Sequence, residues 1–313
     1  MNTQMAKVLH EVCGRPMLAY VLDACRQAGI KKIYVVVGFS AEQVKERFAD
    51  ADDIVWVRQD KQLGTAHAVL CCREYLQDFQ GQTLVLCGDG PLIRSETLRT
   101  LIERHNAVKP AATMATAILE DPAGYGRIVR DEFGNIRGIV EDCDCTKEQS
   151  AIREINPSYY LFETGILREA IDNVKPDNIK QEYYLTDAIA YLISTGRTVL
   201  AVTAVRPEEA MSVNSREQLS TISKIMQLRI QHQLMEDGVT IVAPDNTWIN
   251  ADAKIGQDTI IEPFTYIHSN VTIGENCRIG PFAYVRDGAK VKAGTAVSQD
   301  NFQTKEKGRS NVS

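Results

Sequence analysis

The sequence lacks any long apolar run and any excess of positive charge. No stretch reaches the roughly 18 apolar residues that a membrane-spanning helix needs. Lysine and arginine number 35 against 41 aspartates and glutamates, which gives a net charge of -6. This charge balance argues against a basic nucleic-acid-binding surface and against a polybasic membrane-binding patch. We therefore expect small-molecule chemistry, with no nucleic acid and no membrane as partner.

The sequence also lacks a secretory signal peptide and a paired cysteine framework. Its eight cysteines fall mostly inside apolar segments, and a reducing, cytoplasmic location fits this usage best. Cys143-Asp144-Cys145 has the residue types of a metal site, but no second Cys or His pair stands at ligand spacing. An ordinary reduced loop is the favoured interpretation.

What the sequence does contain is a six-residue repeat near its C-terminus. Every position of one grid is aliphatic: Ile249, Ile255, Ile261, Ile267, Ile273, Ile279, Val285, Val291 and Val297. A second grid, two residues earlier, holds small or slender side chains: Thr247, Ala253, Thr259, Thr265, Val271, Cys277, Ala283, Ala289 and Thr295. This hexapeptide pattern predicts a parallel β-helix, with the aliphatic residue inside and the small one at the corner. Three six-residue rungs close a coil, so the grid supplies just under three coils.

The upstream two thirds alternates helical and strand-like segments. Helices are expected over 18–28, 41–48, 64–75 and 95–105, the last of them capped by Ser95. Strands are expected over 32–37, 54–57, 83–87 and 111–117. The alternation and the fully apolar strands predict a Rossmann-like, doubly wound and mostly parallel sheet, which binds ligands at the carboxyl ends of its strands.

The length of 313 residues suggests more than one domain. Apolar residues at three- and four-residue spacing, stopped by Gly238, predict a helix between the two parts. We expect an α/β domain over 1–216, a linker helix over 217–238, a short left-handed β-helix over 239–298, and a frayed polar tail over 299–313.

Two segments of the α/β domain carry candidate chemistry. Asp89 follows the apolar strand T-L-V-L-C, between two glycines. A carboxylate there suits Mg²⁺, although a plain strand-to-helix turn uses the same residue types. The segment from Gln59 to Ala68 offers glutamines and free amides that can read a base, or it is a solvated loop. His67 packs or faces water, and Arg127 either pairs with a phosphate or is solvated.

Eight motifs in order strengthen this interpretation: K-V-L-H-E-V-C-G-R-P-M, Q-L-G-T-A-H-A, C-G-D-G-P-L, G-Y-G-R-I-V, I-V-E, E-I-N, E-Y-Y-L-T-D and V-N-S-R. Together they closely resemble the uridylyltransferase half of the bacterial family of bifunctional N-acetylglucosamine-1-phosphate uridylyltransferases and glucosamine-1-phosphate acetyltransferases. The resemblance spans roughly residues 1 to 290, including the hexapeptide region.

The resemblance implies a reaction and a set of site residues. UTP and N-acetylglucosamine 1-phosphate would give pyrophosphate and UDP-N-acetylglucosamine, a cell-wall precursor, with Mg²⁺ as cofactor. Lys7 would contact phosphates, and Asp89 and Asn214 would hold the metal. The base would be read by Gln59, Gln62, Gly64 and Thr65, and the sugar pocket would be lined by Gly126, Glu141, Asn156, Tyr184 and Thr186.

The sequence also departs from the family. Family members begin with an apolar strand and an L-x-x-G-x-G-T-R-M loop that wraps the triphosphate, whereas this chain starts at what resembles the final Met. We expect the true start to lie upstream, the alternative being a degenerate copy, and activity of the chain as written to be impaired. Ala6 stands where Pro is usual, Cys87 where a larger or hydroxylic residue is common, and Asn156-Pro157-Ser158 where Asn-Thr-Gly is usual. The last change suggests a shift in sugar specificity.

The acetyltransferase half is the part least represented. Arg286 matches a substrate-binding Arg of that half, but the last histidine is His268, before the position of the family's general base. We expect no acetyltransferase activity. Two other functions stay open: an inactive protein whose β-helix assembles a homotrimer, and a nucleotidyltransferase for another sugar 1-phosphate. A homotrimer through the β-helix is expected in either case.

Overall fold

The computed structural model describes residues 1, 3–178 and 181–298, so the predicted polar tail lies outside the described residues. The chain forms two compact units. Unit 1 consists of Met1–His10 and Met17–Val213, and unit 2 consists of Glu11–Pro16 and Asn214–Ser313. No helix among the described residues is long and apolar enough to cross a membrane. The main division falls near the boundary that the sequence suggested, but the assignment of Glu11–Pro16 to unit 2 has no counterpart in the sequence pattern.

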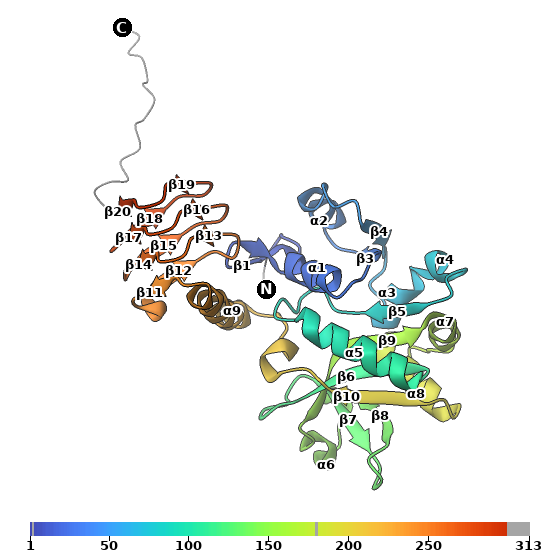
Figure 1. The fold of residues 1–313 in the computed structure, drawn as a ribbon. Helices are drawn as coiled ribbons and strands as arrows, with labels where there is room; N and C mark the ends of the chain where they lie inside the picture. Colours follow the sequence, from blue (N-terminus) through green and yellow to red (C-terminus); the bar gives the residue numbers. More distant parts are fainter. Residues whose placement is uncertain (2, 179–180, 299–313) are drawn as a thin grey trace. The chain divides into compact units, whose positions relative to one another are not determined.

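Unit 1 is built on a six-stranded sheet in the order β10-β6-β9-β7-β8, with β5 also paired to β9 (Figure 1). Its strands are β5 (Gln82–Val85), β6 (Ala112–Ile118), β7 (Gly126–Arg130), β8 (Ile136–Val140), β9 (Glu154–Glu163) and β10 (Val199–Thr203). A separate parallel pair is formed by β3 (Ile33–Val37) and β4 (Ile54–Arg58). The predicted α/β class is confirmed.

The expectation of a mostly parallel main sheet is wrong. β10 and β6 are parallel, but β9 runs antiparallel to β5, β6 and β7. The chain reaches β9 from the β7–β8 hairpin through two short helical turns, η2 (Asp142–Asp144) and α6 (Lys147–Ser150). Because β8 and β9 both pair antiparallel with β7, this connection joins two strands of the same direction that lie on either side of β7.

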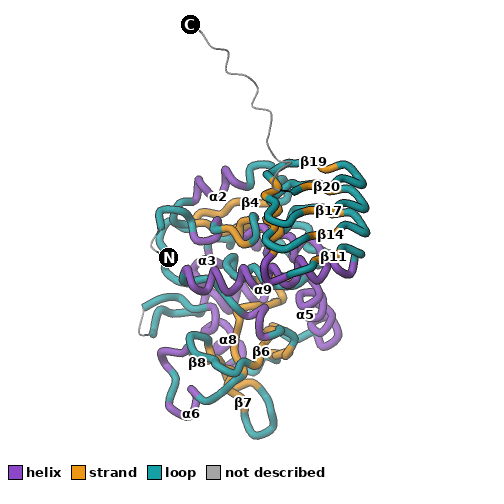
Figure 2. The backbone as a smooth tube through the Cα atoms, turned by 90° about the vertical axis from the view of Figure 1, so that its left-hand side faces the viewer, coloured by secondary structure: helices purple, strands orange, loops and turns teal. Residues whose placement is uncertain are grey.

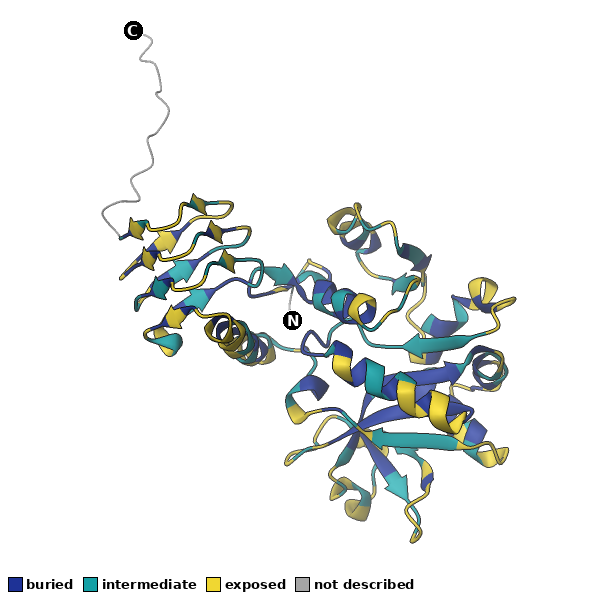
Figure 3. Cartoon of the chain, in the orientation of Figure 1, coloured by how far each residue is buried: buried dark blue, intermediate teal, exposed yellow. Residues whose placement is uncertain are grey.

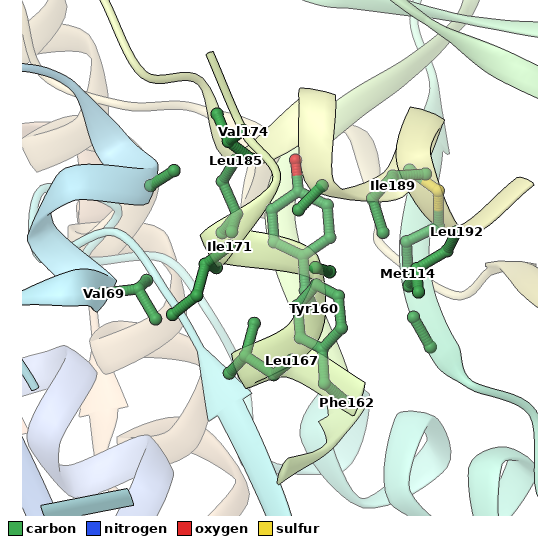
Figure 4. Packing of buried hydrophobic residues seen from close by; sticks show 14 of the residues in the cluster. Val69, Met114, Tyr160, Phe162, Leu167, Ile171, Val174, Leu185, Ile189 and Leu192 are labelled. Carbon is green, nitrogen blue, oxygen red and sulfur yellow. The ribbon is translucent and has the colours of Figure 1, made fainter. Parts of the chain in front are cut away.

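Helices cover both faces of this sheet because β9 buries alternate side chains on opposite sides. Tyr160 and Phe162 pack with α3 (Thr65–Leu70), α7 (Thr164–Asp172) and α8 (Leu185–Ser194), as Figure 4 shows. Tyr159 and Leu161 pack on the other face with α1 (Met17–Gln27) and α5 (Ser95–Val108). Figure 3 accordingly shows β6 and β9 as the most buried strands of the unit.

Two predicted helices differ in detail. The helix expected over 64–75 is divided into α3 and α4 (Arg73–Leu76). Ser95 is not the cap of α5: the capping position is Arg94, without a side-chain cap, and the Ser95 hydroxyl donates to Glu96 instead. The remaining helical turns of unit 1 are η1 (Lys7–Leu9), α2 (Ala41–Arg47) and η3 (Pro207–Ala210).

Unit 2 begins with α9 (Arg216–Glu236), which starts at a capping box formed by Ser215 and Gln218. Three parallel sheets follow, in the orders β11-β14-β17-β20, β12-β15-β18 and β13-β16-β19. Figure 2 shows β11, β14, β17 and β20 stacked one above another. The strands are β11 (Thr240–Ile241), β12 (Thr247–Ile249), β13 (Lys254–Ile255), β14 (Ile260–Ile261), β15 (Thr265–Ile267), β16 (Thr272–Ile273), β17 (Arg278–Ile279), β18 (Tyr284–Val285), β19 (Lys290–Val291) and β20 (Ala296–Val297), with a turn η4 (Pro244–Asn246). The predicted parallel β-helix is confirmed.

The strands of these sheets pair so that the aliphatic residues of the six-residue repeat lie next to one another. Ile249 pairs with Ile267, which pairs with Val285, so partners stand three six-residue rungs apart. These side chains form the apolar interior of the β-helix. The small-residue grid supplies hydrogen bonds at the corners, since the Thr259 hydroxyl donates to the Gly274 carbonyl at 2.9 Å and accepts from the Cys277 amide at 3.1 Å.

Candidate functional site

Lys7 and Asp89 form an ion pair in unit 1. The Lys7 Nζ lies 2.5 Å from Asp89 Oδ2, and the side chains are 39% and 17% exposed, so both groups remain accessible to a ligand. Lys7 lies on the turn η1, and Asp89 follows β5. The Asp89 carbonyl accepts from the Val213 amide at 3.2 Å, which fixes the turn that carries the carboxylate.

In the part of the chain that the structure describes, few side chains near Asp89 are of the kinds that bind a metal ion. The described residues contain no group of three or more His, Cys, Asp or Glu side chains that could hold a metal ion. Such a sparse donor set fits Mg²⁺, which commonly keeps several waters and takes one or two carboxylates together with substrate phosphates. The other expected ligand, Asn214, is the first residue of unit 2 after Val213, so the pairing of Asp89 with Asn214 stays a prediction.

The expected base-reading loop lies between β4 and α3. Gln59 donates from Nε2 to the Gly64 carbonyl at 3.3 Å and lies 2.9 Å from Nδ1 of His67, so His67 orients a loop side chain. Gln62 lies against Gly38, where an added Cβ would come within 2.9 Å of its amide nitrogen. The loop residues are therefore gathered at the carboxyl ends of β3 and β4.

This loop is joined by hydrogen bonds to the segment before α8. The Tyr183 amide donates to the Leu63 carbonyl and the Ala66 amide to the Tyr183 carbonyl, both at 2.8 Å. The Leu185 amide donates to the Thr65 hydroxyl at 2.9 Å. Between them Gly64 has a φ of +112°, and a Cβ there would come within 2.5 Å of the Tyr183 carbonyl oxygen. Glycine is required both by this conformation and by the close approach.

A cleft of about 470 Å³ opens beside that segment. Three expected sugar-binding residues, Glu141, Tyr184 and Thr186, line it, and the Thr186 hydroxyl donates to Glu141 Oε1 at 3.1 Å. The other lining residues are Ile139, Val140, Asp144, Asp177, Asn178 and Asp187. These were not among the expected site residues, although Asp187 closes the E-Y-Y-L-T-D motif that signals the segment.

The two remaining sugar-binding candidates lie on adjacent strands next to Glu141. Gly126 on β7 pairs with Asn156 on β9, and a Cβ at Gly126 would lie 3.6 Å from Glu141 Oε2. Asn156 donates from Nδ2 to the Tyr160 hydroxyl at 2.5 Å and accepts at Oδ1 from the Ser158 amide at 3.0 Å. Ser158 has a φ of +65°, so it adopts the left-handed conformation for which glycine is usual.

The cleft is strongly acidic. Burial raises the pKa of the Asp187 carboxyl above its usual value, and the charges of Glu141 and Asp144 raise it further. Burial also raises the pKa of the Tyr184 phenol to about 12, with Glu182 the largest of the charges that add to this. The phenol therefore stays protonated near neutral pH and can donate a hydrogen bond. An uncharged polyol suits these groups better than an anion does.

Arg127 is neither free for a phosphate nor solvated. Its side chain is buried, with an NH2 to Asp142 Oδ1 distance of 2.8 Å and a further bond to the Tyr125 carbonyl. Cys143 is exposed, and the Cys145 thiol donates weakly to the Glu141 carbonyl at 3.4 Å. Both segments support the cleft wall near Glu141.

A mixed α/β domain with an accessible Lys–Asp pair, a glycine-bearing loop at its strand ends and an acidic polar cleft defines a nucleotide-dependent transferase. Residues 2–206 match the nucleotidyl transferase family, and the chain belongs to that family. Residues 252–287 match the six-repeat bacterial transferase hexapeptide family, which identifies the β-helix as the left-handed type.

Several similar proteins share the name bifunctional protein GlmU. The chain is 47% identical over 265 residues to the protein of Geobacillus sp., covering 85% of this chain and 57% of that protein. It is 45% identical over 263 residues to that of Listeria innocua, covering 84% and 57%, and 43% identical over 265 residues to that of Pelotomaculum thermopropionicum, covering 85% and 58%. The chain thus spans somewhat more than half the length of these relatives.

Proposed function

We propose that the chain transfers a uridylyl group from UTP to N-acetylglucosamine 1-phosphate, forming UDP-N-acetylglucosamine and pyrophosphate. The observation that carries the proposal is the hydrogen-bonded junction between the base-reading loop and the segment before α8. Leu63, Thr65 and Ala66 on one side are bonded to Tyr183 and Leu185 on the other. A loop suited to a base therefore borders directly on a cleft suited to a sugar.

The reaction is an in-line displacement. A phosphate oxygen of the sugar phosphate forms a bond to the α-phosphorus of UTP, and the bond from that phosphorus to the pyrophosphate oxygen breaks. Neither partner needs a protein nucleophile, so positioning and charge carry the catalysis. Lys7 would place its ammonium against the phosphates, and Asp89 would hold a Mg²⁺ ion with Asn214. When bound, the metal supplies positive charge to the departing pyrophosphate.

The cleft groups would select the sugar. Glu141, already held by Thr186, would accept from sugar hydroxyls, and Tyr184 would donate to a sugar oxygen. Asn156 has its amide nitrogen on the Tyr160 hydroxyl, which limits how it can meet an acetamido group. Because Asn156 is bonded to Tyr160 and is followed by Pro157 and Ser158, other sugar 1-phosphates should be tested together with N-acetylglucosamine 1-phosphate.

The test is pyrophosphate release from UTP and Mg²⁺ with a panel of sugar 1-phosphates, read by a coupled inorganic pyrophosphatase and by mass spectrometry of the nucleotide sugar. Product with N-acetylglucosamine 1-phosphate supports the proposal. Product with another sugar alone would replace the substrate, and no product with any sugar would favour an inactive assembly protein. A homotrimer through the β-helix, a cytoplasmic location and the lack of acetyltransferase activity stay predictions, the last checked with acetyl-CoA and glucosamine 1-phosphate.

A further inference from the structure

The chain passes between the two units three times, leaving unit 1 twice and returning to it once. The first two passages are at His10–Glu11 and Pro16–Met17, and the third is at Val213–Asn214. The Met17 amide donates to the His10 carbonyl at 3.1 Å, so the two ends of the segment Glu11–Pro16 are held together. His10 lies three residues after Lys7. The third passage begins at Val213, whose amide bonds the Asp89 carbonyl.

The excursion between the first two passages is a hairpin of β1 (Glu11–Val12) and β2 (Arg15–Pro16). Its turn is anchored within unit 2. The Cys13 carbonyl accepts from the Ala251 amide at 3.0 Å. Its thiol accepts from Gln227 Nε2 at 3.4 Å and donates to the Ser223 carbonyl at 3.5 Å, so one side chain binds two turns of α9.

The fit of the turn depends on a glycine. Gly14 has a φ of +81°, and a Cβ there would come within 2.4 Å of both Asn250 Nδ2 and Ser269 Oγ. Cys13 is only 3% exposed, and burial raises the pKa of its thiol to about 11, so it is unreactive while the hairpin is seated. Arg15 adds an ion pair to Asp252, with Nε to Oδ1 at 3.2 Å.

The turn that carries Lys7 is a single 3-10 turn, and the Ala6 amide before it donates to Gln43 Oε1 at 3.3 Å. Within η1 the Leu9 amide donates to the Ala6 carbonyl at 2.9 Å and the His10 amide donates to the Lys7 carbonyl at 3.2 Å. A single turn of this kind has weak intrinsic stability. Its C-terminal end continues directly into the anchored hairpin.

We propose that the hairpin Glu11–Pro16 is a positioning element for Lys7, with Cys13 and Gly14 as its positioning residues. The hairpin fixes the chain on the C-terminal side of η1, and the ammonium of Lys7 is thereby held at Asp89. The measurement of turnover in the test below rests on the proposed function, whereas the measurement of amide hydrogen exchange does not.

The test compares Gly14→Ala and Gly14→Phe with Gly134→Ala. Gly134 also has a positive φ, +82°, but nothing lies within 4 Å of an added Cβ, so it matches the backbone strain without the clash. Peptide-resolved alkylation of Cys13 reports whether the hairpin has left its seat. Amide hydrogen exchange at Leu9 and His10 reports on η1, and exchange at Leu161 in β9 reports whether unit 1 is folded.

We expect the Gly14 variants to expose Cys13, to speed exchange at Leu9 and His10 but not at Leu161, and to lower kcat about tenfold or more with little change in KM for UTP. Adding Asn250→Ala and Ser269→Ala to Gly14→Ala removes the clashing atoms and should restore slow exchange and kcat. The Gly134 variant should behave as the parent.

The outcomes separate the two proposals. If the parent gives no nucleotide sugar, the proposed function fails, and the exchange at η1 still decides the positioning role. If Cys13 becomes reactive while Leu9 and His10 exchange as in the parent, the hairpin does not position Lys7. If neither Gly14 variant exposes Cys13, the hairpin is not seated as described, and the inference is equally overturned.

Discussion

Gly64 lies against the backbone of Tyr183, so closely that a Cβ would come within 2.5 Å of the carbonyl oxygen and 2.8 Å of the nitrogen. These are main-chain atoms fixed by hydrogen bonds to Leu63 and Ala66, so they cannot move aside as a flexible side chain would. The contact joins the loop after β4, which we propose reads the base, to the segment that lines the acidic cleft.

Gly64→Ala should therefore impair both binding functions at once. The substitution adds backbone strain of about 1–3 kcal/mol at this φ and opens the junction. We expect KM for UTP and for the sugar phosphate to rise about tenfold each, measured by steady-state kinetics. Gly124→Ala is the matched control, since Gly124 has a φ of +83° and no atom within 4 Å of an added Cβ. If the two variants had equal effects, the contact between Gly64 and Tyr183 would have no role in substrate binding.

Asp89→Ala should abolish Mg²⁺-dependent turnover while the protein stays folded. The Lys7–Asp89 pair is partly exposed, and such pairs contribute only about 0–1 kcal/mol to stability. The measurements are pyrophosphate release across a Mg²⁺ titration and the thermal melting temperature. Near-normal turnover in the variant would remove Asp89 from the metal role.

Glu141→Gln should weaken binding of the sugar phosphate and leave UTP binding unchanged. The amide keeps the shape and still accepts from Thr186, but it loses the charge that strengthens bonds from sugar hydroxyls. We expect KM for the sugar phosphate to rise about tenfold at constant kcat. A parallel change in the affinity for UTP, measured by calorimetry, would contradict a role confined to the sugar.

Asp187→Asn should stabilise the protein at neutral pH. Because the folded-state pKa of Asp187 is raised by burial and then by Glu141 and Asp144, the ionised carboxylate destabilises the fold above that pKa. As the pH falls through the raised pKa toward the usual value of 3.8, the group becomes protonated in the fold and the cost disappears. The difference in melting temperature between variant and parent should thus shrink on acidification. A difference independent of pH would assign the effect to packing instead.

The sequence predicted what depends on local periodicity and missed what depends on distant contacts. The spacing of the grid fixes which residues pair, so Ile249, Ile267 and Val285 could be aligned in advance. The bond between Leu185 and Thr65 joins residues 120 positions apart, and no local pattern indicates it. The anchoring of Cys13 in unit 2 was missed for the same reason, since its segment reads as part of the first domain.

The corners of the β-helix hold a further regularity that the sequence only partly reveals. Left-handed backbone recurs every six residues, at Asp258, Phe264, Asn270, Asn276, Phe282, Gly288 and Gly294. Asn, Asp and Gly tolerate this conformation, and they occupy five of these seven positions. Phe264 and Phe282 do not favour it, and their stacked rings, 5.1 Å apart, could be recognised only in the folded chain.

The β-helix should be sensitive to its interior and tolerant on its surface, because each coil is stabilised mainly by its neighbours. Ile267 is fully buried in the middle coil and pairs with strands on both sides. Ile267→Ala should cost about 2–5 kcal/mol, whereas Thr272→Ala, at an exposed position of the next strand, should cost less than about 0.5 kcal/mol. Denaturant unfolding followed by circular dichroism measures both. Since the hairpin turn bonds to this unit, the same Ile267 variant should also raise the reactivity of Cys13 at denaturant concentrations that leave unit 1 folded. An unreactive Cys13 after the β-helix has unfolded would mean that α9 alone seats the hairpin.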